Sequence, residues 1–355
     1  MSSVPPLGYG FITEGLALPP LEQVLRAVRV VDIPMRVTFR SVNRRQSALI
    51  QGPAGWGEFA PFLEYDDHEA AAWLACALES AWLGAPPARR ATIPVNATLP
   101  AVSAERVPEV LNNYRGTIHE LKIKVAEKGQ TLDDDIARVA AAQRALPNAR
   151  LKVDANAGWS VPEALEALAA LNEYDLLYAE QPVATVDELA QVRALVREHD
   201  LSMLIAADES VRKASDPLKV AQAHAADVLI VKAAPLGGTR RALKIVEQAG
   251  LPAVVSSALE SSVGITTGVS LAAALPDLPY ACGLSTVSLM SADVTEDSLL
   301  ARDGELQVRR VAPMESALRR VEAESEVRDA WVERIRRCYL VLQEALHTSL
   351  KPGMF

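Results

Sequence analysis

Short apolar runs alternate with longer segments in which apolar residues recur at helical spacing, from about residue 92 to residue 286. The runs predict eight β-strands, at 93–99, 119–125, 150–156, 175–181, 202–210, 227–234, 252–261 and 280–286. The segments between them predict helices, among them 131–146, 160–171, 185–199, 216–224 and 238–250. Eight strands alternating with helices predict an α/β fold, either a parallel barrel or an open doubly wound sheet.

The chain on either side of this repeat follows a different pattern. Residues 28–39 and 47–61 read as strands with turn residues between them, and 66–84 reads as a helix. Strands followed by a helix predict a separate α+β unit, and the charged, helical stretch 308–350 is expected to pack back on it. We therefore predict four parts, namely a flexible tail at 1–20, an α+β capping unit at 21–91, a (β/α) barrel at 92–304 and a returning segment at 305–355.

Composition and missing motifs narrow the class of protein. A net charge of −9 argues against a nucleic-acid partner and for a small-molecule one. The three cysteines, Cys76, Cys282 and Cys338, are too far apart for a disulfide framework or a zinc site, and they fit a reducing cytoplasm. No apolar run is long enough for a membrane span, and the first residues do not resemble a signal peptide. No glycine-rich nucleotide motif follows a strand, so the open sheet loses support.

Charged residues recur at the ends of the predicted strands. Lys124, Asp154, Glu180, Asp208 and Lys232 follow one another at steps of 30, 26, 28 and 24 residues, each about one strand-plus-helix unit. They are therefore expected at one height, on the C-terminal rim of a barrel, where active sites form.

Three carboxylates at one height repel each other unless a cation lies among them. Oxygen ligands suit a hard divalent ion, so Asp154, Glu180 and Asp208 predict a Mg²⁺ site in which Mn²⁺ can substitute. No histidine belongs to the set, which argues against zinc. For any one of these carboxylates alone, a helix N-cap after a strand is an equal alternative.

Two lysines lie within the second predicted strand. Lys122 and Lys124 share one face, and the other face is apolar. Taken alone, this pattern indicates a half-exposed strand with solvated lysines. Beside a metal ion, burial and the charge of Lys122 would lower the pKa of Lys124, which would then act as a base on an acidic C–H next to a carboxylate. Lys232 would face it across the rim.

This set of residues resembles the enolase superfamily, and within it the muconate-lactonizing subgroup. The matching motifs are KIK at 122–124, DAN at 154–156, EQP at 180–182, ADES at 207–210 and the lysine of VLIVKAAPLGG at 232. Segments 55–67 and 256–264 resemble the cap loop and the seventh-strand segment of the o-succinylbenzoate synthase family of menaquinone biosynthesis. The resemblance implies a modified TIM barrel closed by the N-terminal cap, with Mg²⁺ on the three carboxylates.

The resemblance also implies an activity, that of a hydro-lyase. The reaction would be syn-dehydration of 2-succinyl-6-hydroxy-2,4-cyclohexadiene-1-carboxylate to 2-succinylbenzoate through a metal-stabilised enolate. Lys124 would remove the proton alpha to the carboxylate and then donate to the departing hydroxyl, with Lys232 over the ring. Other strand-end residues are candidates for contacting the substrate or ordering the metal shell: Lys122, Lys152, Asn156, Glu209, Ser256, Ser257, Glu260, Ser261 and Ser262. Ordinary strand-end hydrogen bonding is an equal alternative for each serine.

Several other functions remain open at this point. An N-succinylamino acid racemase would use both lysines as opposed acid and base, and the motifs do not exclude it. A dipeptide epimerase would carry D-x-D in the eighth strand, where this chain reads CGLST, and a mandelate-racemase-like enzyme would carry a histidine in the seventh. Muconate cycloisomerase lacks support from the cap segment. A barrel that binds metal and ligand without catalysis is disfavoured by the complete lysine pair. No helix carries a coiled-coil seam, so monomer and homo-oligomer both stay open, with the monomer slightly favoured.

Overall fold

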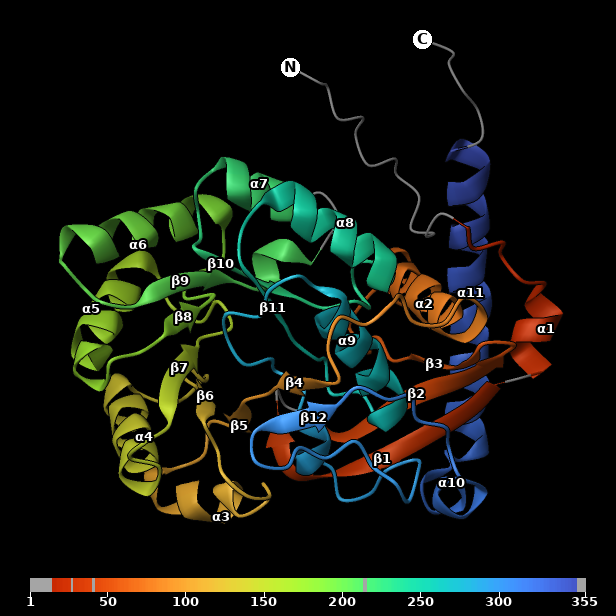
Figure 1. Cartoon of the computed structure of the whole chain (residues 1–355), viewed down its shortest axis with the longest axis horizontal. Helices are drawn as coiled ribbons and strands as arrows, with labels where there is room; N and C mark the ends of the chain where they lie inside the picture. Colours follow the sequence, from red (N-terminus) through yellow and green to blue (C-terminus); the bar gives the residue numbers. More distant parts are fainter. Residues whose placement is uncertain (1–14, 27, 40–41, 213–215, 350–355) are drawn as a thin grey trace, which may run out of the picture.

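A parallel sheet of seven strands forms the centre of the larger unit (Figure 1). The computed structural model describes residues 15–26, 28–39, 42–212 and 216–349. Neighbouring strands follow the order of the sequence, and all pairs in this sheet are parallel. The strands are β5 (Ala97–Leu99), β6 (Glu120–Lys124), β7 (Arg150–Asp154), β8 (Tyr178–Glu180), β9 (Leu204–Ala207), β10 (Val228–Val231) and β11 (Ala253–Val255).

Helices connect the strands and cover the outer face of the sheet (Figure 1). The α-helices are α3 (Val107–Leu111), α4 (Leu132–Ala145), α5 (Val161–Leu171), α6 (Val186–Glu198), α7 (Asp216–Gln222), α8 (Thr239–Ala249) and α9 (Ser262–Ala274). Short 3₁₀ turns are η1 (Ala104–Arg106), η2 (Asn172–Tyr174), η3 (Glu209–Val211) and η4 (Thr286–Leu289). The predicted cap of α4 is present, because the Thr131 side chain accepts from the Asp134 N–H and Asp134 accepts from the Thr131 N–H.

The two edges of the sheet meet through the segment around Cys282. The Cys282 N–H donates to the Pro94 carbonyl (2.8 Å), and the Cys282 carbonyl accepts from the Asn96 N–H (2.9 Å). On the other side, the Gly283 N–H donates to the Val255 carbonyl (2.8 Å). Both bridges are parallel, so the sheet closes into a barrel.

Two of the predicted strands differ from the observed ones. The eighth, expected at 280–286, is reduced to the isolated bridges at Cys282 and Gly283. The first, expected at 93–99, divides in two. Its first half, β4 (Thr92–Pro94), pairs antiparallel with β12 (Glu305–Gln307), and only β5 enters the barrel. The apolar pattern of 93–99 does not reveal the division, because every second residue from Ile93 to Leu99 is apolar and buried.

Lys152 lies inside the barrel and joins the closing segment to two strands. Its side chain is fully buried, and its Nζ donates to Glu120 Oε2 (2.9 Å) and to the Ala281 carbonyl (2.8 Å). The Ala281 N–H donates to the same Glu120 oxygen (3.0 Å). Lys152 also lies over the ring of Tyr178, 5.1 Å from its centroid. The sequence placed Lys152 among the candidate substrate contacts, whereas the structure places it in the closure of the barrel.

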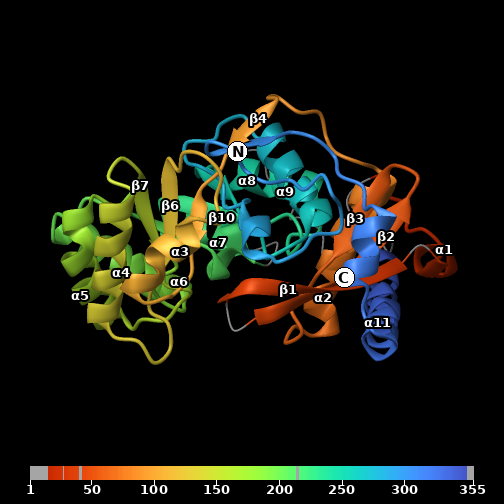
Figure 2. The same cartoon turned by 90° about the horizontal axis from the view of Figure 1, so that it is seen from below.

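The smaller unit is an antiparallel meander covered by helices. Its strands are β1 (Val28–Phe39), β2 (Val42–Gly52) and β3 (Gly55–Phe59), and its helices are α1 (Leu21–Arg26) and α2 (Asp67–Trp82). Gly57 lets β3 approach α2, because a Cβ there would lie 2.0 Å from the Ala77 carbonyl oxygen. After the barrel, α10 (Glu315–Val321) and α11 (Ser325–Ser349) return to this unit, where α11 packs on α2 and β1 (Figures 1 and 2). The predicted return of the C-terminal segment is therefore observed.

The predicted flexible tail at 1–20 is only partly within the described chain. Residues 1–14 lie outside the described residues. Leu16 is buried against the core, and the Pro19 carbonyl accepts a hydrogen bond from the Tyr339 hydroxyl of α11 (2.7 Å). The stretch from Leu16 to Pro19 thus packs on the cap instead of lying loose. Among the helices that the structure describes, each is too short or too polar to cross a lipid bilayer.

Replacing Lys152 by methionine should destabilise the protein by about 3 kcal/mol, since the buried Glu120 carboxylate would lose its ammonium partner. The loss should appear in urea unfolding followed by circular dichroism. The double variant Lys152→Met with Glu120→Leu should regain part of it, because no buried charge is then left unpaired; Arg150, the other partner of Glu120, is more than half exposed to water. Lys128→Met, on an exposed loop, serves as control. An unchanged free energy of unfolding in Lys152→Met would contradict this role for Lys152.

Candidate active site

Five charged residues gather at the C-terminal ends of neighbouring barrel strands. Lys124, Asp154 and Glu180 are the last residues of β6, β7 and β8, and the strand register sets them side by side. Asp208 follows β9 and Lys232 follows β10. The structure thus brings together the residues that the sequence placed at one height. All three carboxylates are at most 4% exposed, so their charges are held away from water.

Each of these carboxylates is contacted by a lysine ammonium group. Lys122 Nζ lies 2.9 and 3.1 Å from the two oxygens of Glu180 and 3.2 Å from Asp154 Oδ2. Lys124 Nζ donates to the same Asp154 oxygen at 2.5 Å. On the far side, Lys232 Nζ donates to Asp208 Oδ1. Lys122, which the sequence predicted as an added positive charge, in fact bridges two carboxylates.

Burial and neighbouring charges separate the proton affinities of these groups. Burial raises the pKa of Glu180, and the charge of Asp154 raises it further. Lys122 opposes the shift, and the resulting pKa is about 8. Burial also acts to raise the pKa of Asp154, but Lys124 and Lys122 outweigh it and hold that pKa well below its ordinary value. For Lys124, burial lowers the pKa, and Lys122 adds to the effect against the opposing charge of Asp154. Lys124 therefore releases its proton more readily than an ordinary lysine.

Lys122 differs from Lys124 although the two share one face of β6. Burial acts to lower the pKa of Lys122, but the charges of Glu180 and Asp154 outweigh it, so the net shift is upward. Lys122 thus remains a cation, and Lys124 is the member of the pair that is suited to act as a base.

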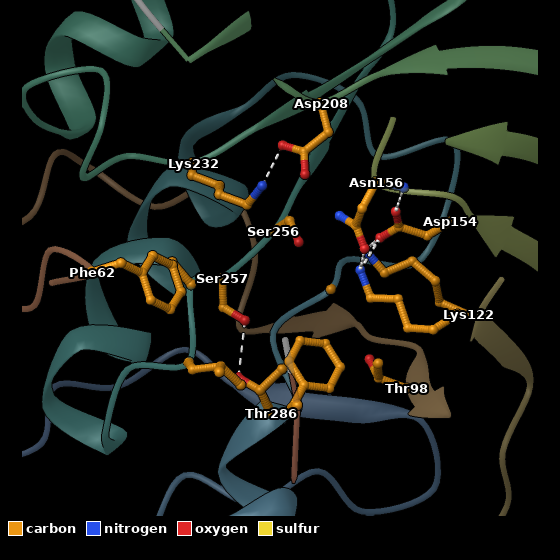
Figure 3. Close-up of a pocket in the computed structure, with 15 residues that line it drawn as sticks. Phe62, Thr98, Lys122, Asp154, Asn156, Asp208, Lys232, Ser256, Ser257 and Thr286 are labelled. Carbon is orange, nitrogen blue, oxygen red and sulfur yellow. Dashed lines mark hydrogen bonds and ion pairs between the residues drawn. The ribbon is translucent and has the colours of Figure 1, made fainter. Parts of the chain in front are cut away.

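A pocket opens in front of these charges and has an uncharged opposite wall of aromatic, aliphatic and hydroxyl side chains (Figure 3). Figure 3 shows Lys232 and Asp208 on one side of it and Lys122 and Asp154 on the other. Lys124 also lines it, and the rest of the lining is Phe39, Phe62, Thr98, Asn156, Ser256, Ser257, Ala258, Leu259, Gly283 and Thr286. Charges on one side and aromatic rings on another suit a small anion with a planar carbon skeleton.

Seven lining residues are not among the predicted site residues: Phe39, Phe62, Thr98, Ala258, Leu259, Gly283 and Thr286. Thr98 is the last polar residue of the first predicted strand, one position before its end at Leu99. The search for polar residues at strand ends, which found the charges, could therefore have found it. Phe39 and Phe62 come from the cap, and Thr286 comes from η4. Thr286 is the last residue of the eighth predicted strand, so the strand-end rule could also have found it. No periodic signal marks Phe39 and Phe62, because they reach the pocket only through the packing of the two units.

Asn156 links the base to the next strand end. Its Oδ1 accepts from Lys124 Nζ (2.5 Å), and its Nδ2 donates to Glu209 Oε1 (3.2 Å). The backbone of Asn156 is left-handed, with φ of 45°, a conformation that asparagine tolerates better than most residues. Asn156 thus orients the Lys124 ammonium group. Glu209 does not line the pocket and accepts a second hydrogen bond from Arg212 (2.6 Å).

The predicted serine segment divides between pocket and interior. Ser256 and Ser257 line the pocket, and the Ser257 hydroxyl lies 2.9 Å from that of Thr286. The next three predicted residues do not line it. Glu260 accepts from the Ala258 N–H, Ser261 donates to Glu58, and Ser262 donates to Asp293. For these three the structure shows contacts that fix the start of α9.

The carboxylates have the donor chemistry that a hard divalent ion requires. Asp154, Glu180 and Asp208 offer only oxygen ligands, from three adjacent strand ends. Within the described ranges, no three acidic, histidine or cysteine groups already surround one point, and each of the three carboxylates is paired with a lysine ammonium group instead. Burial and then the charge of Asp154 raise the pKa of Glu180, and a cation bound beside this carboxylate would favour its ionised form. The residues present therefore fit a divalent ion.

Comparison with family models matches most of the chain to one superfamily. Residues 103–313 match the enolase C-terminal domain-like family, and residues 30–81 match the enolase N-terminal domain-like family. Curated relatives cover nearly the whole chain. The o-succinylbenzoate synthase of Mycolicibacterium smegmatis is 52% identical over 326 residues, which is 92% of this chain and 99% of the relative. That of Mycobacterium tuberculosis is 50% identical over 92% of this chain and 97% of its own length.

Solved structures of the same superfamily share the fold. The muconate lactonizing enzyme from Pseudomonas putida superposes with a TM-score of 0.68 at 20% identity, over 83% of this chain and 98% of that one. The 2-chloromuconate cycloisomerase from Rhodococcus opacus gives a TM-score of 0.71 at 24% identity, over 84% and 98%. These likenesses establish the barrel and its cap.

A divalent cation should raise the melting temperature of the protein, since enzymes of this superfamily generally use such an ion. At a hundredfold excess over Kd the stabilisation is about 2.7 kcal/mol. Differential scanning fluorimetry with and without MnCl₂ measures it. Asp208→Asn should abolish the metal-induced shift, whereas Asp187→Asn, exposed on α6, should keep it. Equal shifts in the two variants would exclude Asp208 as a ligand.

Proposed function

This chain belongs to the o-succinylbenzoate synthase family of the enolase superfamily, and we propose that it dehydrates 2-succinyl-6-hydroxy-2,4-cyclohexadiene-1-carboxylate to 2-succinylbenzoate for menaquinone biosynthesis. The observation that carries this proposal is the placement of Lys124 and Lys232 on two sides of one pocket, each against a carboxylate. The pocket thereby offers a base and a facing cation to a ring that bears a carboxylate.

Lys124 is the proposed base. Its lowered pKa favours the neutral amine, and the Asn156 oxygen fixes the direction of its Nζ. The Phe39 ring lies 5.2 Å from Nζ and keeps water from one side of it. Lys124 removes the proton alpha to the carboxylate and, once protonated, donates to the hydroxyl that leaves from the same face. One residue therefore serves both proton transfers of a syn elimination.

Lys232 stabilises the negative charge that develops on the substrate. Its ammonium group reaches the pocket from the strand end opposite β6, and it is held there by Asp208. A divalent ion held by Asp154, Glu180 and Asp208, Mg²⁺ in this proposal and Mn²⁺ as a substitute, would supply further positive charge against the substrate carboxylate. Lys122 favours the ionised form of two of these carboxylates and holds them in place.

The uncharged wall suits the remainder of the substrate. Phe39, Phe62 and Leu259 offer apolar surface to the ring. The hydroxyls of Ser257 and Thr286, which lie 2.9 Å apart, can donate to the second carboxylate at the end of the succinyl chain.

We also propose the cellular setting and the division of the chain. A reducing, cytoplasmic location is supported by three cysteines that are free and buried. The boundaries at residues 21 and 92 are supported by the change from cap elements to barrel elements. The boundary at 305 is not supported, because β12 still pairs with β4, and the return to the cap begins at α10. We propose a monomer, because one chain supplies every residue of the pocket described above.

Lys124→Ala should lower kcat for the dehydration by about a thousandfold or more, the scale of a lost general base. The loss of the cyclohexadiene absorbance measures the rate, and EDTA should abolish it in the wild type. Lys128→Ala, four residues further on and exposed, is the matched control and should retain full activity. A Lys124→Ala variant that is folded and fully active would remove Lys124 from the reaction.

The racemase alternative is favoured by the same two-sided lysine pair. An N-succinylamino acid racemase needs a base on each face of the alpha carbon, and both lysines line the pocket. If this activity is present, Lys232→Ala should abolish racemisation of an N-succinylamino acid while Lys124 still exchanges one proton with D₂O, seen by NMR. Fast racemisation by a wild type that fails to dehydrate the cyclohexadiene would replace the main proposal with this one.

A further inference from the structure

We propose that Arg45 is a positioning residue that fixes the uncharged wall of the pocket and thereby sets the affinity for the substrate; this inference rests on the proposed function. Arg45 lies on β2 of the cap and does not line the pocket. It connects two pieces of the wall that come from different units, namely the cap turn at Phe62 and the barrel loop after β11.

The guanidinium group of Arg45 is bonded entirely to carbonyl oxygens. It is 4% exposed, and its Nε donates to the Leu259 carbonyl at 3.1 Å. Its Nη2 donates to the carbonyls of Ala258 (3.1 Å) and Ala60. Its Nη1 donates to the Gln46 carbonyl (3.2 Å). The forked N–H groups of the guanidinium therefore join the cap backbone to the barrel backbone, a geometry that a lysine ammonium group cannot reproduce.

The same guanidinium contacts a pocket side chain directly. Its central carbon lies 4.6 Å from the centroid of the Phe62 ring, within the range of a cation–π contact. Phe62, Ala258 and Leu259 all line the pocket. Arg45 thus touches the three wall residues from behind, without reaching the space in front of them.

The loop that Arg45 holds has an unfavourable backbone. Leu259 has φ of 63°, in the left-handed region that a leucine rarely adopts. Such a conformation persists only where surrounding contacts enforce it. The Leu259 carbonyl is the acceptor of Arg45 Nε, so the arginine stabilises the strained residue directly.

Glu58, on the neighbouring strand β3, holds the other end of the same loop. Its carboxylate accepts from the Ser261 N–H (3.2 Å), the Ser261 hydroxyl (2.5 Å) and the Gly264 N–H (2.8 Å). A Cβ at residue 264 would lie 2.8 Å from Glu58 Oε2, so only glycine permits this approach. The cap therefore holds the loop by its carbonyls with a cation and by its amides with an anion.

Three variants separate positioning from general stability. Arg45→Lys keeps the positive charge and loses the forked hydrogen bonds of the guanidinium group. Arg44→Met removes the adjacent, half-exposed arginine, which pairs with Asp32 on the surface. Val321→Ala opens a cavity at a buried residue of α10, away from the pocket. It is the control for a loss of stability that does not involve the pocket wall. All three are studied as the full chain with MgCl₂.

Arg45→Lys should raise KM and the Kd for o-succinylbenzoate by roughly tenfold, with a smaller fall in kcat. Hydrogen exchange in 256–264 should become faster in this variant. In Arg44→Met and Val321→Ala, KM, Kd and exchange in 256–264 should remain those of the wild type. Product affinity is measured by isothermal titration calorimetry, and exchange by mass spectrometry.

Unchanged exchange in 256–264, or an unchanged product Kd, in a folded Arg45→Lys variant would overturn the proposal. The same change of KM in Val321→Ala would also overturn it, because the effect would then follow stability alone. A wild type that does not dehydrate the cyclohexadiene refutes the proposed function instead. In that case the exchange comparison, which needs no substrate, still decides whether Arg45 fixes the loop.

Discussion

Buried lysine–carboxylate contacts are the interaction on which this structure depends. A charge inside a protein is costly unless an opposite charge and hydrogen bonds compensate it. The barrel interior holds two such groups at different depths. Lys152 and Glu120 lie deep and join the closing segment to β6 and β7. At the rim, carboxylates occupy three successive strand ends and lysines occupy the strand ends on either side, where the pocket gives a substrate access to them. The same chemistry therefore closes the fold at one depth and prepares a reaction at another.

Two units share the construction of the pocket, and each supplies a different kind of surface. The barrel strand ends contribute the charges, whose positions are fixed by backbone pairing and vary little. The cap contributes the aromatic rings of Phe39 and Phe62, which rest on packing between the units. Selectivity for one carboxylate over another consequently depends on contacts that hold the cap against the barrel loop. Arg45 and Glu58 are central to these contacts, since both are buried and both bind the loop backbone.

The sequence predicts the repeating parts of this molecule well. Alternation of apolar runs and helical segments predicted a barrel or an open sheet. Spacing of about one repeat predicted that Lys124, Asp154, Glu180, Asp208 and Lys232 lie at one rim, because each repeat adds one strand end. The remainder depends on contacts between residues far apart in the chain. Lys152 shares one face of its predicted strand with Asp154 and was therefore counted among the site candidates. In the structure it donates to the carbonyl of Ala281, 129 residues away. The pairing of Lys122 with Glu180 is likewise a matter of side-chain reach, which periodicity does not encode.

The central claim is that a divalent ion and a substrate carboxylate bind next to each other between Lys124 and Lys232. A crystal structure with Mn²⁺ and o-succinylbenzoate, with the ion located by its anomalous scattering, tests this most directly. The account predicts Mn²⁺ on oxygens of Asp154, Glu180 and Asp208, about 2.2 Å away as is usual for such ligands. It also predicts a product carboxylate on the ion, with Lys124 and Lys232 on two faces of the ring. Manganese bound elsewhere, or a product whose ring carbons lie away from both ammonium groups, would contradict it.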